Sequence, residues 1–163
     1  MERHNLFVPN KLAYARGERP SVPCILCAAI AGDPKVTGLM AATTERFAVL
    51  ANLYPYNPGH MMIVPQRHIE DVVDFTEAEV LELHQVQVRT LGVLRELYTP
   101  TGINLGYNIG VTSGASIPHL HLHLVPRHQS EQGFMDIIGG GRVIVEDPCV
   151  TLDRFRTAWE RQS

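Results

Sequence analysis

The sequence predicts an α+β fold, in which a mostly antiparallel sheet packs against one long helix and a few short ones. Two observations carry this prediction. Short apolar segments bounded by Gly, Pro and Asn recur along the chain, which is typical of strands joined by turns. One longer segment has a helix-start signal followed by apolar residues at helical spacing. Mostly antiparallel strands with a single long helix define the α+β class.

The first two predicted strands span residues 47–53 and 60–64. The linker between them, residues 54–59, contains proline, asparagine and glycine, which form turns. The two segments are therefore expected to form an antiparallel pair. Further strands are predicted at 103–109, 120–125 and 143–145, and a glycine-bearing loop at 110–116 joins the first two of these.

The clearest helix is predicted to begin after Thr76 and to run to about Tyr98. The Thr76 hydroxyl can cap the first turn while Glu79 reaches back to it, which is the capping-box spacing. Pro100 lies just beyond the predicted end. The face expected to pack on the sheet consists of Val80, Leu83, Leu91, Leu94 and Tyr98. Short helical segments are expected at 28–31 and around Leu152, Phe155 and Trp159.

All of residues 1–163 are expected to form a single domain, with 1–23 as an extended arm and 148–163 as a C-terminal tail. The formal net charge is −3, so the basic excess of a general nucleic-acid or anionic-membrane binder is missing. No long apolar run suits a membrane span, and the N-terminus lacks the order of a signal peptide. These features predict a cytoplasmic protein without nucleic-acid or membrane partners.

Histidine and leucine alternate over residues 119–124. Side chains of a strand alternate between its two faces, so His119, His121 and His123 are expected on one accessible face and the leucines in the core. Three interpretations compete: histidines without chemistry, zinc ligands that activate a water, and a neutral imidazole that attacks phosphorus. The loop at 110–116 offers backbone N–H groups and hydroxyls to phosphate oxygens, which favours phosphoryl chemistry.

A Cys24-x-x-Cys27 pair precedes the first predicted strand. It can supply two thiolates to a zinc site that needs two further ligands, or it can be a redox pair. A redox pair normally accompanies a thioredoxin-like βαβ pattern, which the sequence does not show. The third cysteine, Cys149, is expected to be partly buried and without a function.

Three longer motifs carry a family resemblance. The triad is His119-Leu120-His121-Leu122-His123-Leu124-Val125. A second motif runs from Asn52 to His60 and continues in Val64-Pro65-Gln66-Arg67-His68. The third comprises Asn104, Gly106, Asn108, Gly110 and Gly114 before the triad, with Val125-Pro126-Arg127 and Phe134-Met135 after it. Together they resemble the histidine-triad family, in the branch of diadenosine tetraphosphate phosphorylases and fragile-histidine-triad hydrolases. The resemblance covers residues 8–147 and implies the α+β fold of that family.

The resemblance also implies roles for individual residues. His121 corresponds to the nucleophile that takes the nucleoside monophosphate, and His123 to a phosphate contact. Asn52 matches the position that binds the ribose, and His60 belongs to the nucleoside-binding hairpin. The remaining implied contacts to the phosphates or to the bridging oxygen are Asn108, Gly114, Ala115 and Ser116. Ala115 replaces a Gln found in many relatives, and His128 stands where a Trp often follows Pro-Arg.

Zinc-bearing relatives and the related galactose-1-phosphate uridylyltransferases imply a structural zinc held by Cys24, Cys27, His68 and His119, with His60 as the alternative to His68. The reaction implied by the family is cleavage of dinucleoside polyphosphates through a nucleotidyl-histidine, with water or orthophosphate as acceptor and no catalytic cofactor. The alternatives are a nucleoside phosphoramidase of the same family and a non-catalytic module that signals by binding nucleotide. Members are often homodimers, so a homodimer that binds adenine nucleotides is expected.

Overall fold

A computed structural model describes residues 20–129 and 146–162. Its centre is a five-stranded antiparallel sheet in the order β1-β2-β3-β5-β4. The strands are β1 (Met40–Thr43), β2 (Phe47–Ala51), β3 (Met61–Pro65), β4 (Gly102–Tyr107) and β5 (Leu122–Arg127). The predicted α+β fold is confirmed, and so is the antiparallel pairing of the hairpin that joins β2 to β3.

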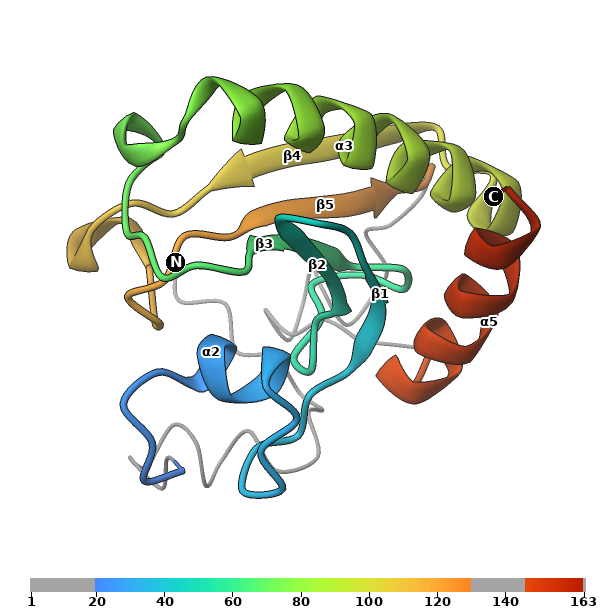
Figure 1. Ribbon diagram of the computed structural model, residues 1–163. Coiled ribbons are helices and arrows are strands. Elements are labelled where there is room, and N and C mark those ends of the chain that lie inside the picture. Colours follow the sequence, from blue (N-terminus) through green and yellow to red (C-terminus); the bar gives the residue numbers. More distant parts are fainter. Residues whose placement is uncertain (1–19, 130–145, 163) are drawn as a thin grey trace.

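The helices cover both faces of this sheet (Figure 1). The long helix α3 (Glu77–Tyr98) and the C-terminal helix α5 (Pro148–Arg161) lie on one face, and the short helix α2 (Ile25–Ile30) lies on the other. Alternate residues of β2 and β3 contribute to two apolar clusters, one under α3 and α5 and one under α2. Because both faces are covered, every residue of β2 and β3 is buried.

Helix α3 begins as predicted. The Thr76 hydroxyl accepts a hydrogen bond from the backbone N–H of Glu79, and the Glu79 carboxylate accepts one from the N–H of Thr76. The predicted core face is wrong in part, because Val80 is 52% exposed whereas Val86, Thr90 and Val93 are buried. Two polar residues lie on the buried side and obscured it in the sequence. Thr90 donates its hydroxyl to the Val86 carbonyl, and Glu79 pairs with Arg67.

Several boundaries differ from the sequence prediction. Strand β1 was not predicted, since it is a short edge strand without clear alternation of polar and apolar residues. The triad strand begins only at Leu122, because the backbone N–H of Leu120 bonds to Ile69, which lies beyond the end of β3. His119 and His121 therefore precede the strand. The predicted strand at 143–145 and residues 1–19 of the arm lie outside the described part of the chain.

The loop between β2 and β3 is fixed at its tip. The buried side chain of Asn57 donates to the backbone carbonyl of Pro126 in β5. Gly59 has a φ of +76° and packs so closely on the ring of Tyr98 that an added Cβ would lie 2.7 Å from it. Only glycine fits such a site, because a side chain would be strained by its backbone conformation and would collide with the ring. These contacts place His60 at the start of β3.

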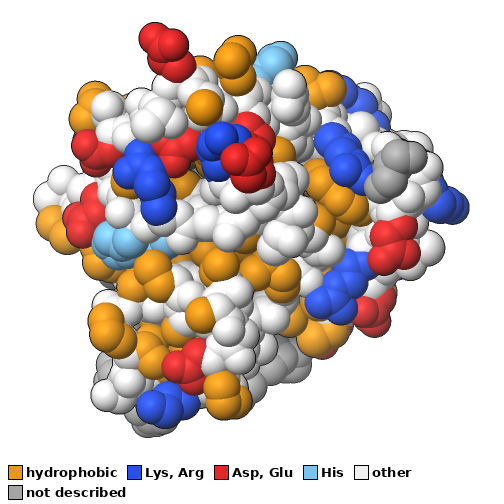
Figure 2. Space-filling model, in the orientation of Figure 1, with side chains coloured by type: hydrophobic (Ala, Val, Ile, Leu, Met, Phe, Trp, Pro, Cys, Tyr) orange, Lys and Arg blue, Asp and Glu red, His pale blue; other side chains and the backbone are white. Residues whose placement is uncertain are grey.

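Hydrophobic and charged side chains lie over different parts of the fold. In the view of Figure 2, hydrophobic side chains gather between α2 and the sheet, whereas acidic and basic side chains lie mainly over α3 and α5. No helix in the described ranges is long and apolar enough to cross a membrane. Cys149, which was expected to be partly buried, is exposed near the start of α5.

Candidate active site

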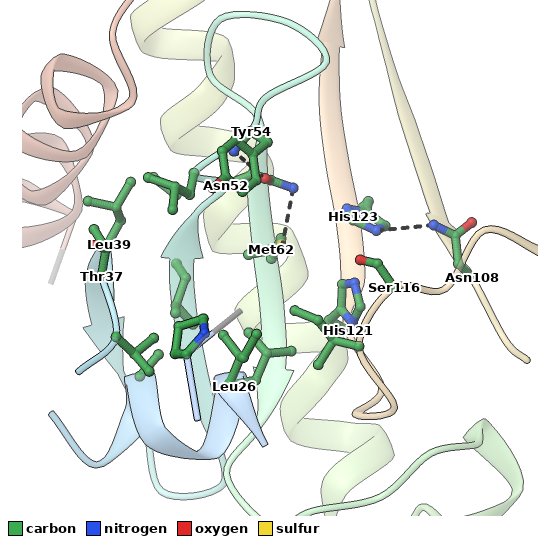
Figure 3. Close-up of a pocket in the computed structure, with 18 of the residues that line it drawn as sticks. Leu26, Thr37, Leu39, Asn52, Tyr54, Met62, Asn108, Ser116, His121 and His123 are labelled. Atoms are coloured by element: carbon green, nitrogen blue, oxygen red, sulfur yellow. Dashed lines mark hydrogen bonds between the residues drawn. The ribbon is translucent and has the colours of Figure 1, made fainter. Parts of the chain in front are cut away.

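A cavity of about 500 Å³ lies between α2, the sheet face beneath it and the loop at 110–116. Figure 3 shows His121, His123, Asn108 and Ser116 at one end and Thr37 and Leu39 at the other. The walls in between are largely apolar and come from α2 and from strands β2 and β3; they include Ile25, Leu26, Ala29, Leu50 and Met62. A cavity with largely apolar walls and with polar side chains towards its ends suits a ligand that has both apolar and polar parts.

His121 has a fixed tautomer. Its Nδ1–H donates to the backbone carbonyl of His119 over 2.7 Å, so Nε2 keeps its lone pair. Burial lowers the pKa of His121, and the hydrogen bond to the carbonyl partly offsets this effect. The imidazole is therefore neutral at neutral pH and lines the cavity as a potential nucleophile.

His123 stands at the end of a chain of hydrogen bonds. The backbone N–H of Tyr56 donates to Nδ1 of His60 over 3.0 Å, so neutral His60 carries its proton on Nε2. That N–H faces Nδ1 of His123 at 2.9 Å. Neutral His123 then carries its own proton on Nε2, 3.4 Å from the amide nitrogen of Asn108; two donors do not bond each other, so both can donate to a ligand. The chain makes His123 a hydrogen-bond donor.

The imidazoles of His60 and His123 both resist protonation. Burial, followed by the nearby imidazoles of His123 and His121, lowers the pKa of His60 to about 3. Burial and the neighbouring His121 lower the pKa of His123 to about 4. The ring of Tyr56 stacks on His60 with centroids 4.8 Å apart and shields it from water. The site thus holds three neutral imidazoles in contact.

Asn52 is held between the hairpin and the cavity. Its side-chain oxygen accepts from the backbone N–H of Tyr54, and its amide nitrogen lies 3.5 Å from the sulfur of Met62. On the other side, the loop at 110–116 has positive φ at Gly110 and Gly114, which non-glycine residues rarely adopt. Ser116 is the last residue of this loop and lies beside both His121 and His123 in Figure 3.

A second group of potential metal ligands joins α2 to the segments after β3 and before β5. The ligand atoms of Cys24, Cys27, His68 and His119 are all within 4.8 Å of one another. Sγ of Cys24 and Sγ of Cys27 both lie 3.4 Å from Nδ1 of His119. Sγ of Cys27 also lies 3.4 Å from Nδ1 of His68. These four side chains could hold one metal ion.

The group fits zinc. With Zn–S of about 2.3 Å and Zn–N of about 2.0–2.1 Å, a tetrahedral site needs sulfur and nitrogen atoms about 3.5 Å apart. Outer partners also match, because Nε2–H of His119 donates to the carbonyl of Pro65 over 2.9 Å and Nε2 of His68 lies 3.5 Å from the Glu70 carboxylate. His60 is hydrogen-bonded to His123 at the cavity and is not part of the metal cluster, so His68 is the fourth ligand.

Most residues singled out in the sequence meet at one of these two places. The cavity is lined by His121, His123, Ser116, Asn52, Asn108 and Gly114. His60 lies behind His123, and Ala115 is not among the lining residues. The predicted accessible histidine face is wrong: His119, His121 and His123 are 1%, 6% and 9% exposed, because α2 and the neighbouring loops cover that side of the sheet.

Sequence reasoning missed two contributors to the site. One is the wall formed by Ile25 and Leu26, which lie between the two cysteines. A metal motif gives no role to the residues between its ligands. Tyr56 acts through its backbone N–H, for which its side chain gives no signal. If residues 24–29 had been predicted as a helix, its periodicity would have placed the two cysteines on one face and the apolar residues on another.

Residues 35–130 match the family model of the HIT domain. The chain belongs to the HIT family. The curated relatives include an AP-4-A phosphorylase of Mycobacterium tuberculosis, which is 39% identical over 126 residues, covering 77% of this chain and 65% of that protein. An asymmetrical bis(5'-nucleosyl)-tetraphosphatase of Schizosaccharomyces pombe is 30% identical over 95 residues, or 58% of this chain and 52% of that protein. The chain thus aligns with less than two thirds of either relative.

Solved structures of HIT proteins share the fold. A zinc-bound histidine triad family protein from Mycobacterium smegmatis superposes with a TM-score of 0.70 at 25% identity, over 86% of this chain and 95% of the other. A HIT family member from Bacillus subtilis gives a TM-score of 0.62 at 28% identity, over 66% of this chain and 75% of that one.

Proposed function

We propose that this HIT protein cleaves dinucleoside polyphosphates of the diadenosine tetraphosphate type through a covalent nucleotidyl-histidine at His121. The observation that carries the proposal is the hydrogen bond from Nδ1 of His121 to the His119 carbonyl, which leaves Nε2 unprotonated within the cavity. The names of the phosphorylase and tetraphosphatase relatives support this class of substrate.

In the first step, the Nε2 lone pair attacks the α-phosphorus and the bond from that phosphorus to the bridging oxygen breaks. The bonding electrons leave with the remaining nucleotide. The imidazole keeps its Nδ1 proton and becomes positively charged, and the His119 carbonyl that accepts this proton stabilises the charge. No separate base is needed, because the attacking nitrogen carries no proton.

The other polar groups serve the phosphates. Nε2–H of His123, the Asn108 amide and the Ser116 hydroxyl lie at the same end of the cavity and can donate to phosphate or bridging oxygens. Backbone N–H groups at 114–116 can stabilise the equatorial oxygens, as donors fixed in place do in other phosphoryl transfers. Asn52 is the proposed ribose contact, and the apolar walls receive the base.

In the second step an acceptor oxygen attacks the nucleotidyl-histidine, the P–N bond breaks and its electron pair returns to Nε2 of His121, while the proton of the acceptor is released to solvent. Water as acceptor makes the protein a hydrolase, and orthophosphate makes it a phosphorylase. With orthophosphate as acceptor the kinetics are ping-pong, because the first nucleotide leaves before phosphate reacts.

We also propose that Cys24, Cys27, His68 and His119 bind a structural zinc ion. Bound zinc would crosslink α2 to the segments that follow β3 and precede β5. It would take no part in the bond-breaking steps, and it would make His119 a ligand rather than a reagent.

The test compares turnover of diadenosine tetraphosphate by the wild type and by His121→Asn, a substitution that leaves no nucleophile. We expect a loss of at least about 10³-fold in kcat, with an unchanged circular dichroism spectrum. Glu160→Gln, at an exposed position of α5, is the control and should keep full activity. Near-normal turnover by His121→Asn would contradict the proposal. Products formed with and without orthophosphate identify the acceptor, since ATP plus ADP requires phosphate and ATP plus AMP requires water.

A further inference from the structure

Helix α2 has two faces with different tasks. Cys24, which caps the helix, and Cys27 lie three residues apart and face the metal cluster. Ile25, Leu26 and Ala29 face the cavity and form one of its walls. The same short helix therefore carries half of the metal ligands and a wall of the proposed nucleoside site.

This helix depends on its neighbours. Its six residues are too few to be stable alone. Within the described residues, its backbone hydrogen bonds stay in the segment 24–33 and none reaches the sheet. What ties it to the sheet is the packing of Leu26 and Ala29 on β2 and β3 and the sulfur contacts to His68 and His119.

The cluster also reaches the proposed nucleophile. His119 offers its side chain to the cluster and its backbone carbonyl to Nδ1 of His121. Its Nε2–H donates to the carbonyl of Pro65 at the end of β3, which fixes the residue on a second side. A shift of His119 would therefore move the hydrogen-bond acceptor that holds His121.

We propose that metal binding at this cluster and nucleotide binding in the cavity are thermodynamically coupled through α2 and His119. Cys24, Cys27, His68 and His119 are then positioning residues for the nucleotide site. The proposal rests on the proposed function, because it takes the cavity to be the nucleotide site. Coupling of this kind is reciprocal: zinc must tighten nucleotide binding by the same factor as nucleotide tightens zinc binding.

The test measures both sides of this cycle with AMP, which has no leaving group and cannot be turned over. Calorimetry gives the Kd of AMP for the zinc-bound and the zinc-free protein, and chelator competition gives the Kd of zinc with and without AMP. We expect both ratios to equal one factor of about 5- to 100-fold. Equal AMP affinity in both folded forms would overturn the coupling. A zinc-bound protein that does not bind AMP at all would overturn the proposed function as well.

Two variants separate coupling from a general loss of structure. Leu26→Ala keeps every metal ligand but shortens the wall, so it should weaken AMP binding and reduce the effect of AMP on zinc affinity. If the zinc-free protein unfolds, this variant decides, because the rate at which zinc is lost to a chelator, with and without saturating AMP, is compared with the wild type starting from zinc-bound protein. Cys149→Ser alters an exposed cysteine away from the cluster and should change neither affinity. A full effect of AMP on zinc affinity in Leu26→Ala would contradict the proposal.

Discussion

The roles of the triad residues depend on their hydrogen bonds to backbone groups. His121 is oriented by the carbonyl of His119, and His123 by a chain that begins at the backbone N–H of Tyr56. Alternation in the sequence predicted that the three histidines would share one side of the sheet, and they do. It could not predict these hydrogen bonds, because backbone donors and acceptors leave no trace in residue type.

The pH dependence of kcat/KM tests the state of His121. Burial lowers its pKa below the ordinary value of 6.5, so the neutral form persists into mildly acidic solution. We expect kcat/KM for diadenosine tetraphosphate to stay level from neutral pH down to about 6.5 and to fall only below that. A rise in activity as the pH drops from 7 to 6 would show that a protonated His121 is the active form.

Substitution of His60 tests the histidine chain. His60→Asn removes the N–H that sets the tautomer of His123. We expect kcat to fall about 10- to 100-fold with little change in KM, because His60 is not among the residues that line the cavity. Steady-state kinetics measure both parameters, and a rise in KM alone would assign His60 to substrate binding instead.

At the scale of elements, the start of α3 was predicted correctly and its packing face only in part. The capping box is a local signal that two residues, Thr76 and Glu79, carry. The buried face includes Glu79 and Thr90, whose polar groups are satisfied by Arg67 and by the Val86 carbonyl. Apolar periodicity cannot find such residues, since polar side chains are buried here only because a hydrogen-bond or ion-pair partner satisfies them.

Glu79 joins the capping box to the segment that carries His68. The hydrogen bond from Arg67, strengthened by the Thr76 N–H, lowers the pKa of Glu79 to about 2 against the opposing effect of burial. Glu79→Gln keeps the shape but loses the charge, and we expect it to lower the free energy of unfolding by about 2 kcal/mol. Urea denaturation measures this loss, with Glu77→Gln in the exposed first turn as control. Equal stability of the two variants would contradict the account.

At the scale of the whole molecule, acid should destabilise the fold through the histidine chain. The pKa values of His60 and His123 rise from about 3 and about 4 in the folded protein towards 6.5 on unfolding. Between these limits the unfolded state binds more protons, so stability falls as the pH is lowered from 6.5 towards 4. Urea midpoints at pH 7 and pH 5 measure the fall, which His60→Asn should reduce. An unchanged fall in that variant would place the acid-sensitive groups elsewhere.

The family resemblance predicts a homodimer, and exposed apolar side chains on α3 and β4 are the residues we expect its interface to cover. Val80, Leu81 and Val88 are exposed on α3, and the edge strand β4 exposes Leu105. We expect the protein to sediment as a dimer and Leu81→Glu to shift it to the monomer, measured by analytical ultracentrifugation. A monomeric wild type would contradict this expectation.

The central claim is that catalysis passes through a covalent bond to one histidine. Acid would break a P–N bond, so the reaction with diadenosine tetraphosphate should be stopped with base in the steady state and the peptides examined by mass spectrometry. The account predicts an adenylyl group on the peptide that contains His121 in the wild type and none in His121→Asn. Turnover without any adduct in a rapidly quenched reaction, or an adduct on another residue, would contradict it.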